Sequence, residues 1–180
     1  MSLSHLPSVS ITGSGLFTPP ETITNAELVA SLTEATSKWN AEHAEQIAAG
    51  ELAERALPDE EFIVKASGIE RRHVMEKSGV LDPARMRPHL DTRAEDELGI
   101  QAEMSLPAID EALAQAGRSR SDVDAVIVGC SNLQRAYPAV AIEIQDALGA
   151  DGWGYDMNVA CSSATFSVQA GVDALRNGSA

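Results

Sequence analysis

Residues 156–166 read DMNVACSSATF, and this stretch places a cysteine where a strand gives way to a helix. Residues 154–159 predict a strand, and the small apolar residues of 161–175 predict a buried helix. The first turn of a helix presents unpaired backbone N–H groups and a partial positive charge. A thiolate at Cys161 would be stabilised there, and the same N–H groups could donate to an oxyanion. We therefore interpret Cys161 as a candidate nucleophile.

Cys161 also has a plain structural interpretation, because free cysteine is among the most buried residue types. Cys130 has the same two interpretations, but it closes the apolar run DAVIVGC and no helix starts beside it. For Cys130 we expect inert packing. The sequence places no histidine next to Cys161, so we expect each one to be a surface or strand residue. The four histidines are His5, His43, His73 and His89.

The segments on either side of residues 156–166 alternate between strands and helices. The continuous apolar run at 124–130 is typical of a strand buried on both faces. A long helical pattern, which Pro107 should kink, precedes it over 92–116, and a shorter helix follows over 139–148. Helices between successive strands predict an α/β fold with a mostly parallel mixed sheet covered by helices on both faces.

The first ninety residues predict strands at 9–16 and 69–75, a helix opened by the capping box Thr24–Glu27, and a helix over 60–67 closed by Gly68. Small residues near 13–15 should let another backbone approach closely. The Ala/Glu-rich residues 38–57 predict an exposed amphipathic helix, and residues 76–91 predict an irregular excursion.

Composition excludes several classes of partner. The chain has 180 residues and a formal net charge of −14, so it repels nucleic-acid backbones and anionic membrane surfaces. No apolar run approaches the ~18 residues of a membrane span, and the first residues lack the features of a secretory signal. Two cysteines make no disulfide framework, so we expect a reduced, cytoplasmic setting, and we expect no metal site.

Six short blocks occur in an order that resembles the N-terminal half of the β-ketoacyl-acyl-carrier-protein synthase III family, which has the thiolase-like fold. The blocks are ITGSGLFTPP (11–20), GIERRHV (68–74), ALAQAG (112–117), DAVIVGCSNL (124–133), AYPAVAIEIQ (136–145) and DMNVACSSATF (156–166). The resemblance covers the chain from about residue 10 to its last residue.

The resemblance implies a Claisen condensation. A cysteine, here Cys161, takes an acyl group from acyl-CoA; malonyl-acyl-carrier protein then decarboxylates and its carbanion attacks the thioester. By position, Tyr137 matches an aromatic residue that borders the acyl pocket across a homodimer. Phe62 stands where the family often has a tryptophan that stacks on the CoA adenine, while Ala66 replaces the family arginine that contacts the CoA phosphates. No cofactor beyond the acyl-CoA substrate is expected.

The resemblance also implies that this chain is incomplete. We interpret residues 1–180 as an N-terminal thiolase-like half with insertions near 35–57 and 76–91, which favour a branch that accepts medium-chain acyl groups. The family histidine and asparagine that drive decarboxylation lie in the C-terminal half. We therefore expect a missing C-terminal half or a second chain as partner, because a buried strand edge would otherwise stay unpaired.

Two other hypotheses remain open. One is a different thiolase-fold condensing enzyme, of the polyketide (chalcone-synthase-like) or hydroxymethylglutaryl type, whose discriminating residues would lie in the missing half. The other is a non-catalytic subunit that pairs with a catalytic partner, in which Cys161 is structural.

Overall fold

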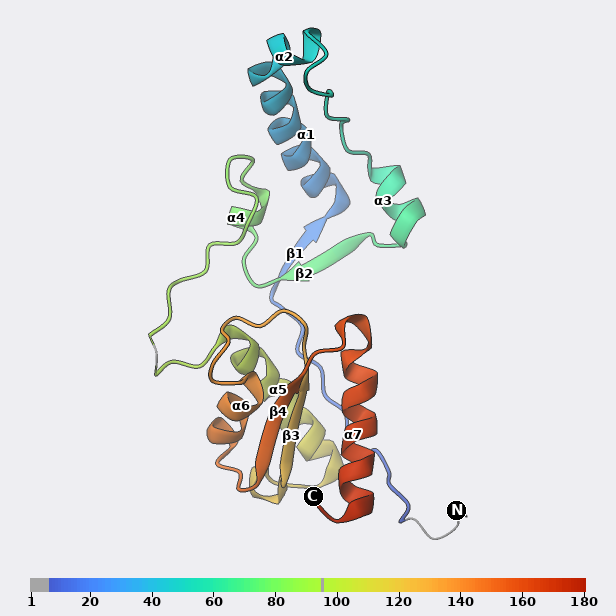
Figure 1. Ribbon diagram of the computed structural model, residues 1–180, viewed down its shortest axis with the longest axis vertical. Helices are drawn as coiled ribbons and strands as arrows, with labels where there is room; N and C mark the ends of the chain where they lie inside the picture. The colour runs from blue at the N-terminus through green and yellow to red at the C-terminus, as the bar shows by residue number, and fades with distance from the viewer. Residues whose placement is uncertain (1–6, 95) are drawn as a thin grey trace. The chain divides into compact units, whose positions relative to one another are not determined.

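A computed structural model describes residues 7–94 and 96–180, and the chain divides into two compact units. The cysteine unit comprises described residues 7–17 and 93–180, and the hairpin unit comprises residues 18–92. Figure 1 labels the elements of both units. In the part of the chain that the structure describes, no helix is long and apolar enough to cross a membrane.

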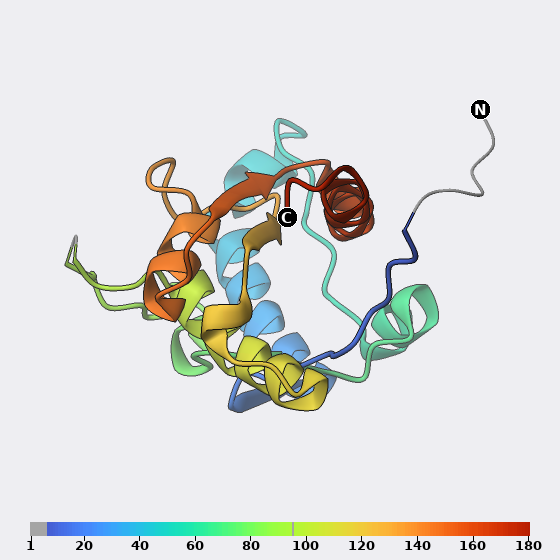
Figure 2. The same ribbon diagram turned by 90° about the horizontal axis from the view of Figure 1, so that it is seen from below.

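Two parallel strands form the centre of the cysteine unit. Its elements are α5 (Ile100–Ala116), the 3-10 turn η2 (Arg120–Asp122), β3 (Ala125–Gly129), α6 (Val140–Leu148), β4 (Trp153–Met157), the 3-10 turn η3 (Ala160–Ser162) and α7 (Ser163–Asn177). β3 pairs with β4 in a register that runs from Ala125↔Trp153 to Gly129↔Met157. Helices α5 and α6 lie on one side of this pair and α7 on the other (Figures 1 and 2).

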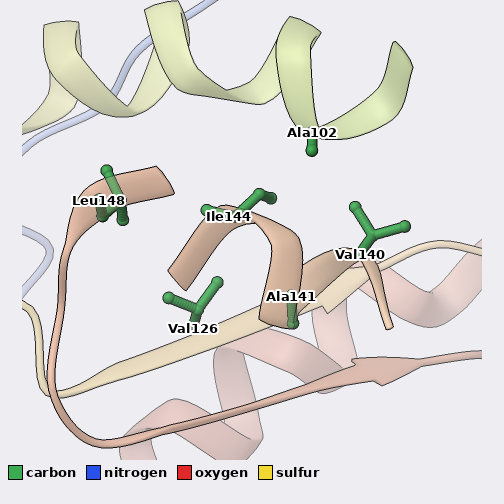
Figure 3. Close-up of a cluster of buried hydrophobic side chains, with 6 residues drawn as sticks. All are labelled: Ala102, Val126, Val140, Ala141, Ile144 and Leu148. Atoms are coloured by element: carbon green, nitrogen blue, oxygen red, sulfur yellow. The ribbon is translucent and has the colours of Figure 1, made fainter. Parts of the chain in front are cut away.

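The core of the cysteine unit lies between β3 and the two helices on its α6 side. Six buried side chains from α5, β3 and α6 form it: Ala102, Val126, Val140, Ala141, Ile144 and Leu148 (Figure 3). The start of α6 is fixed by the Asp156 carboxylate, which accepts hydrogen bonds from the N–H groups of Val140 (2.9 Å) and Ala141 (2.8 Å). This carboxylate satisfies two donors that the helix itself leaves unpaired, and it ties α6 to β4.

An antiparallel strand pair organises the hairpin unit. Its elements are β1 (Glu21–Thr24), α1 (Asn25–Glu42), α2 (Ala44–Ala48), α3 (Glu60–Ser67), β2 (Arg71–Val74) and α4 (Ser78–Leu81). β1 and β2 pair from Glu21↔Val74 to Thr24↔Arg71. The predicted capping box is confirmed, because the Thr24 hydroxyl accepts from the Glu27 N–H and the Glu27 carboxylate accepts from the Thr24 N–H.

Most of the predicted elements are confirmed. The parallel pair β3–β4 with helices on both faces confirms the predicted class of fold for the cysteine unit. In the hairpin unit, α3 ends at Gly68 as predicted, and this glycine has a left-handed φ of 70°. The half-exposed strand predicted at 69–75 is β2.

The strand predicted at 9–16 is wrong, since residues 7–17 form no strand in the structure. The backbone there follows α5, and its donors are taken by side chains: the Ser14 N–H donates to Gln115 Oε1 (2.6 Å) and the Leu16 N–H to Glu111 Oε2 (2.9 Å). The expected close backbone approach is confirmed. A Cβ on Gly13 would lie 2.0 Å from the Ala112 carbonyl oxygen, so only glycine fits.

Four further expectations are corrected. The helix expected over 92–116 begins at Ile100, and the helix expected over 38–57 breaks at His43 and ends at Ala48. β3 is not buried on both faces, because Val126 is its one buried residue. The helix α7 is not buried either, since Phe166, Val168 and Leu175 are each about half exposed at 52%, 56% and 50%. These last two corrections share a cause: among the described elements of the cysteine unit, β3 pairs with β4 alone and α7 packs against the strand pair on one side only.

Candidate active site

Cys161 lies in the short turn η3, between the carboxyl end of β4 and the first residue of α7. Its side chain is exposed. The interpretation of Cys161 as a packed core residue therefore does not hold in this structure. An exposed thiol next to the N-terminal end of a fifteen-residue helix has the placement expected for a nucleophile.

The backbone just before Cys161 has an unusual conformation. Ala160 has a φ of 47°, in the left-handed region, which costs about 1–2 kcal/mol for a residue with a Cβ. Side chains on either side bind its two polar groups: the Ala160 N–H donates to Asn158 Oδ1 (3.2 Å), and its carbonyl accepts from Ser163 Oγ (2.8 Å). The turn that presents the sulfur is thus stabilised by local side-chain hydrogen bonds.

The carboxyl ends of both strands meet beneath this turn. The Cys130 N–H donates to the Met157 carbonyl (3.1 Å), which extends the parallel ladder by one residue. At Gly129 a Cβ would lie 2.9 Å from both the Ser163 carbonyl carbon and the Ala164 nitrogen. The absence of a side chain at Gly129 therefore lets the first turn of α7 rest on the end of β3.

Cys130 is in a different environment from Cys161. It is half-buried, and Gln101 on α5 donates from Nε2 both to its sulfur (3.1 Å) and to the Asn132 carbonyl (2.5 Å). The Gln134 N–H donates back to Gln101 Oε1 (3.0 Å), so one α5 side chain organises the whole loop after β3. These contacts support the packing role expected for Cys130.

The two residues predicted to contact substrate belong to different units, and both are exposed. Tyr137 belongs to the same unit, in the loop before α6, and is 87% exposed. Phe62 lies on α3 in the hairpin unit and is 68% exposed. Both aromatic rings are free to meet a ligand or another chain, but their substrate roles stay predictions.

The three described histidines all lie in the hairpin unit, where two of them bond to backbone carbonyls. The Nδ1 atom of His43 is 2.8 Å from the Trp39 carbonyl oxygen, and that of His73 is 3.1 Å from the Pro19 carbonyl oxygen. His89 is engaged through its backbone N–H, which donates to Glu76 (2.6 Å). His5 lies outside the described residues. Within residues 7–94 and 96–180, no group of three or more potential metal ligands lies together.

A cavity of about 470 Å³ opens between α5, α6 and β3, and it is lined largely by aliphatic side chains. Its lining does not include Cys161. The cavity therefore does not connect an acyl-sized space to the sulfur within the cysteine unit.

Sequence reasoning missed three polar residues that shape this site: Gln101, Asp156 and Ser163. Ser163 lies two residues after the cysteine, so a search for side chains that could bind the backbone of that turn would have found it. Asp156 binds the start of α6 instead, and nothing in the stretch 156–166 points to that contact. Gln101 carries no such signal, because it lies far along the chain and meets the Cys130 loop only after folding.

Comparison with known proteins gives sequence relatives, although no protein-family model matches the chain. A β-ketodecanoyl-acyl-carrier-protein synthase from Pseudomonas aeruginosa is 58% identical over 143 residues, which are 79% of this chain and 41% of the relative. A β-ketoacyl-acyl-carrier-protein synthase III from Granulibacter bethesdensis is 31% identical over 131 residues, 72% of this chain and 34% of that protein.

Over the part that it spans, this chain belongs to the β-ketoacyl-acyl-carrier-protein synthase III family. It covers well under two thirds of the length of these synthases. The solved structure of the synthase III from Aquifex aeolicus matches with a TM-score of 0.62 at 19% identity, over 94% of this chain and 41% of that one. OleA from Xanthomonas campestris matches with a TM-score of 0.67 at 15% identity, over 96% of this chain and 41% of that one. The fold is thus thiolase-like, as predicted.

Proposed function

We propose that this chain is the cysteine-bearing part of an acyltransferase that condenses an acyl-CoA primer with malonyl-acyl-carrier protein in fatty acid biosynthesis. One observation carries the proposal. The exposed sulfur of Cys161 lies at the start of α7, in a chain that is 58% identical to a β-ketodecanoyl-acyl-carrier-protein synthase over most of its length. A sulfur at that place is open to a thioester, and the N-terminal end of a helix in general favours negative charge.

In the first half-reaction the Cys161 thiolate attacks the thioester carbonyl of acyl-CoA and CoA leaves as its thiolate. The acyl group is then held on Cys161. In the second half-reaction the malonyl group loses carbon dioxide, and the resulting carbanion attacks the acyl-cysteine carbonyl. The product is a 3-oxoacyl-carrier protein, and Cys161 returns as a thiolate. Backbone N–H groups at the start of α7 would stabilise the oxyanion of each tetrahedral intermediate.

The decarboxylating histidine and asparagine would come from outside these 180 residues. We propose that the chain corresponds to the N-terminal half of the synthase, with insertions near 35–57 and 76–91, and works with a C-terminal half or second chain in a cytoplasmic homodimer. The half-exposed apolar side chains of α7 support this, because exposed apolar surface calls for a covering partner. In that assembly Phe62 would stack on the CoA adenine and Tyr137 would border the acyl pocket.

The primer is proposed to be a medium-chain acyl group. The support is the name of the 58% identical relative, which describes a ketodecanoyl product. Decarboxylative condensation adds two carbons, so a ketodecanoyl product requires an octanoyl primer. The expectation of a medium-chain branch, made from the resemblance, agrees with this choice.

Acyl transfer to the sulfur tests the proposal directly. The chain is incubated separately with acetyl-, octanoyl- and palmitoyl-CoA, and intact mass is measured over time. We expect an octanoyl adduct on Cys161 that forms fastest of the three, is lost in Cys161→Ser and persists in Cys130→Ser. If no adduct forms on Cys161 even with the C-terminal part of the synthase present, the enzymatic proposal fails and the non-catalytic subunit is favoured.

A further inference from the structure

Ser163, the first residue of α7, is almost fully buried although it is polar and lies two residues from the exposed sulfur. We propose that Ser163 is a positioning residue, which holds Cys161 in its reactive orientation by fixing the turn that carries it. This inference rests on the proposed function, in which Cys161 is the acyl acceptor. It concerns a residue that acts on the sulfur only through the backbone between them.

The Ser163 hydroxyl bridges the two residues that precede Cys161. Its oxygen accepts a hydrogen bond from the Val159 N–H at 2.9 Å and donates its own proton to the Ala160 carbonyl at 2.8 Å. Since a hydroxyl has a single proton to donate, that proton is committed to Ala160. Ser163 therefore acts on the reaction through the backbone, and it has no proton to offer a substrate.

The turn needs such a bridge because Ala160 is in the left-handed region, with a φ of 47°. A residue with a Cβ leaves that region readily unless its surroundings hold it there. The Ser163 hydroxyl binds the carbonyl of Ala160, while Asn158 Oδ1 accepts from its N–H at 3.2 Å. If the bridge is lost, Ala160 relaxes towards negative φ and the next residue, Cys161, changes direction.

Ser163 is itself well anchored. It is 4% exposed, and a Cβ on Gly129 would lie 2.9 Å from its carbonyl carbon, so its backbone rests against the end of β3. The hydroxyl thus connects a point fixed on the sheet to a strained turn that bears the nucleophile. By holding this turn, Ser163 preorganises the Cys161 sulfur, and preorganisation of a reactive group raises the rate of its reaction.

The decisive test compares Ser163→Thr with Ser163→Val in the full chain. These two side chains have nearly the same shape, and only threonine keeps a hydroxyl. The rate of carbamidomethylation of each cysteine by iodoacetamide is followed by peptide mass spectrometry. We expect Cys161 in the valine variant to react about tenfold more slowly than in the threonine variant. The carbamidomethylation rate of Cys130 should be equal in the two variants, and it serves as the control for a general loss of folded structure. Ser162→Ala, which removes a hydroxyl that makes no bond at the helix start, should match the wild type.

A second variant separates positioning from packing. Ala160→Gly lets the turn adopt its left-handed φ without a steric penalty. Adding Ala160→Gly to Ser163→Val should recover most of the Cys161 alkylation rate that Ser163→Val loses. If Ser163→Val acted only through a packing defect, the effects of the two substitutions on that rate would simply add. With octanoyl-CoA, the valine variant should lower the saturating rate of acylation and leave the half-saturating concentration unchanged.

Equal Cys161 rates in the threonine and valine variants would overturn the positioning role, whatever the acyl-CoA result. Failure of the proposed function has a different signature. In that case iodoacetamide still distinguishes threonine from valine at Cys161, but no acyl-CoA gives an adduct on the wild-type sulfur, with or without the C-terminal part.

Discussion

Single residues in this chain act mainly through the backbone groups that they bind. Asp156 fixes the start of α6, Ser163 fixes the turn before Cys161, and Gln101 organises the loop that contains Cys130. In the hairpin unit Glu27 has the same kind of role. Its carboxylate accepts from Lys77 Nζ (2.5 Å) and from both the N–H and the hydroxyl of Thr24 (2.9 Å each).

Glu27 makes the hairpin unit sensitive to acid. The hydrogen bond from Lys77, followed by those from Thr24, lowers the pKa of Glu27 from 4.5 to about 2. Because the folded pKa is below the unfolded one, this stabilisation is complete above about pH 4.5 and is lost as the pH falls towards about 2. We expect Glu27→Gln to lower the urea midpoint at about pH 7 and to leave it nearly unchanged at about pH 2.

The matched control is Glu34→Gln, which removes an exposed carboxylate from the same helix. This control should leave the acid dependence of the midpoint as it is in the wild type. The pKa of Glu76 is also lowered to about 2, by hydrogen bonds from Ser78 and His89. Part of the fall of the urea midpoint in acid therefore remains in both variants. A Glu27→Gln protein whose midpoint falls equally at both pH values would show that the carboxylate contributes no titratable stability.

Among the elements, α7 and β3 set the position of the site. The start of α7 touches the end of β3 only because position 129 has no side chain. We expect Gly129→Ala to destabilise the chain by about 2–3 kcal/mol in urea unfolding, since its Cβ would overlap backbone that cannot move away easily. The same substitution should slow the alkylation of Cys161, because the turn shifts with the helix.

Gly171→Ala provides the comparison within the same helix. No atom from outside the neighbouring residues and backbone of α7 lies within 4 Å of the Cβ that it adds, so it should be neutral or stabilise by about 0.5–1 kcal/mol through the better helix propensity of alanine. Similar losses of stability in both variants would mean that the contact between α7 and β3 is not tight.

The predictability of each element follows from how local its cause is. The capping box at Thr24 and the glycine that ends α3 act over three or four residues, so their residues could be recognised in the sequence. The segment 9–16 has the composition of a strand, but its N–H groups bond to Gln115 and Glu111 about a hundred residues away. A local sequence pattern cannot show that side chains of α5 will take the N–H groups that a neighbouring strand would otherwise bind.

For the whole molecule, the main consequence is an apolar surface that the described chain does not cover. Phe166 lies on one side of α7 and Val168 and Leu175 on the other, and each is about half exposed; within the described residues β3 pairs with β4 alone. Such faces and edges promote association. We expect the isolated chain to self-associate in light scattering, and Phe166→Asp to reduce the apparent mass.

Thr165→Asp is the control for that substitution, since it adds the same charge to an exposed neighbouring position and removes no aromatic side chain. It should leave the scattering close to that of the wild type. A wild-type chain that remains a single monomer at all concentrations would contradict both this expectation and the predicted need for a complement.

The sequence alone determined the local features of this protein. The helix caps, the run that forms β3 and the cysteine between β4 and α7 were evident from residue type and spacing, because each depends on near neighbours in the chain. The order of the motifs along the chain also indicated the family.

Tertiary structure decided which sulfur is exposed and what holds it. Cys161 is exposed on a turn that Ser163 fixes, whereas the sulfur of Cys130 accepts a hydrogen bond from Gln101 on α5. Burial and hydrogen bonding between distant segments depend on how the chain packs, and packing is a property of the folded chain as a whole.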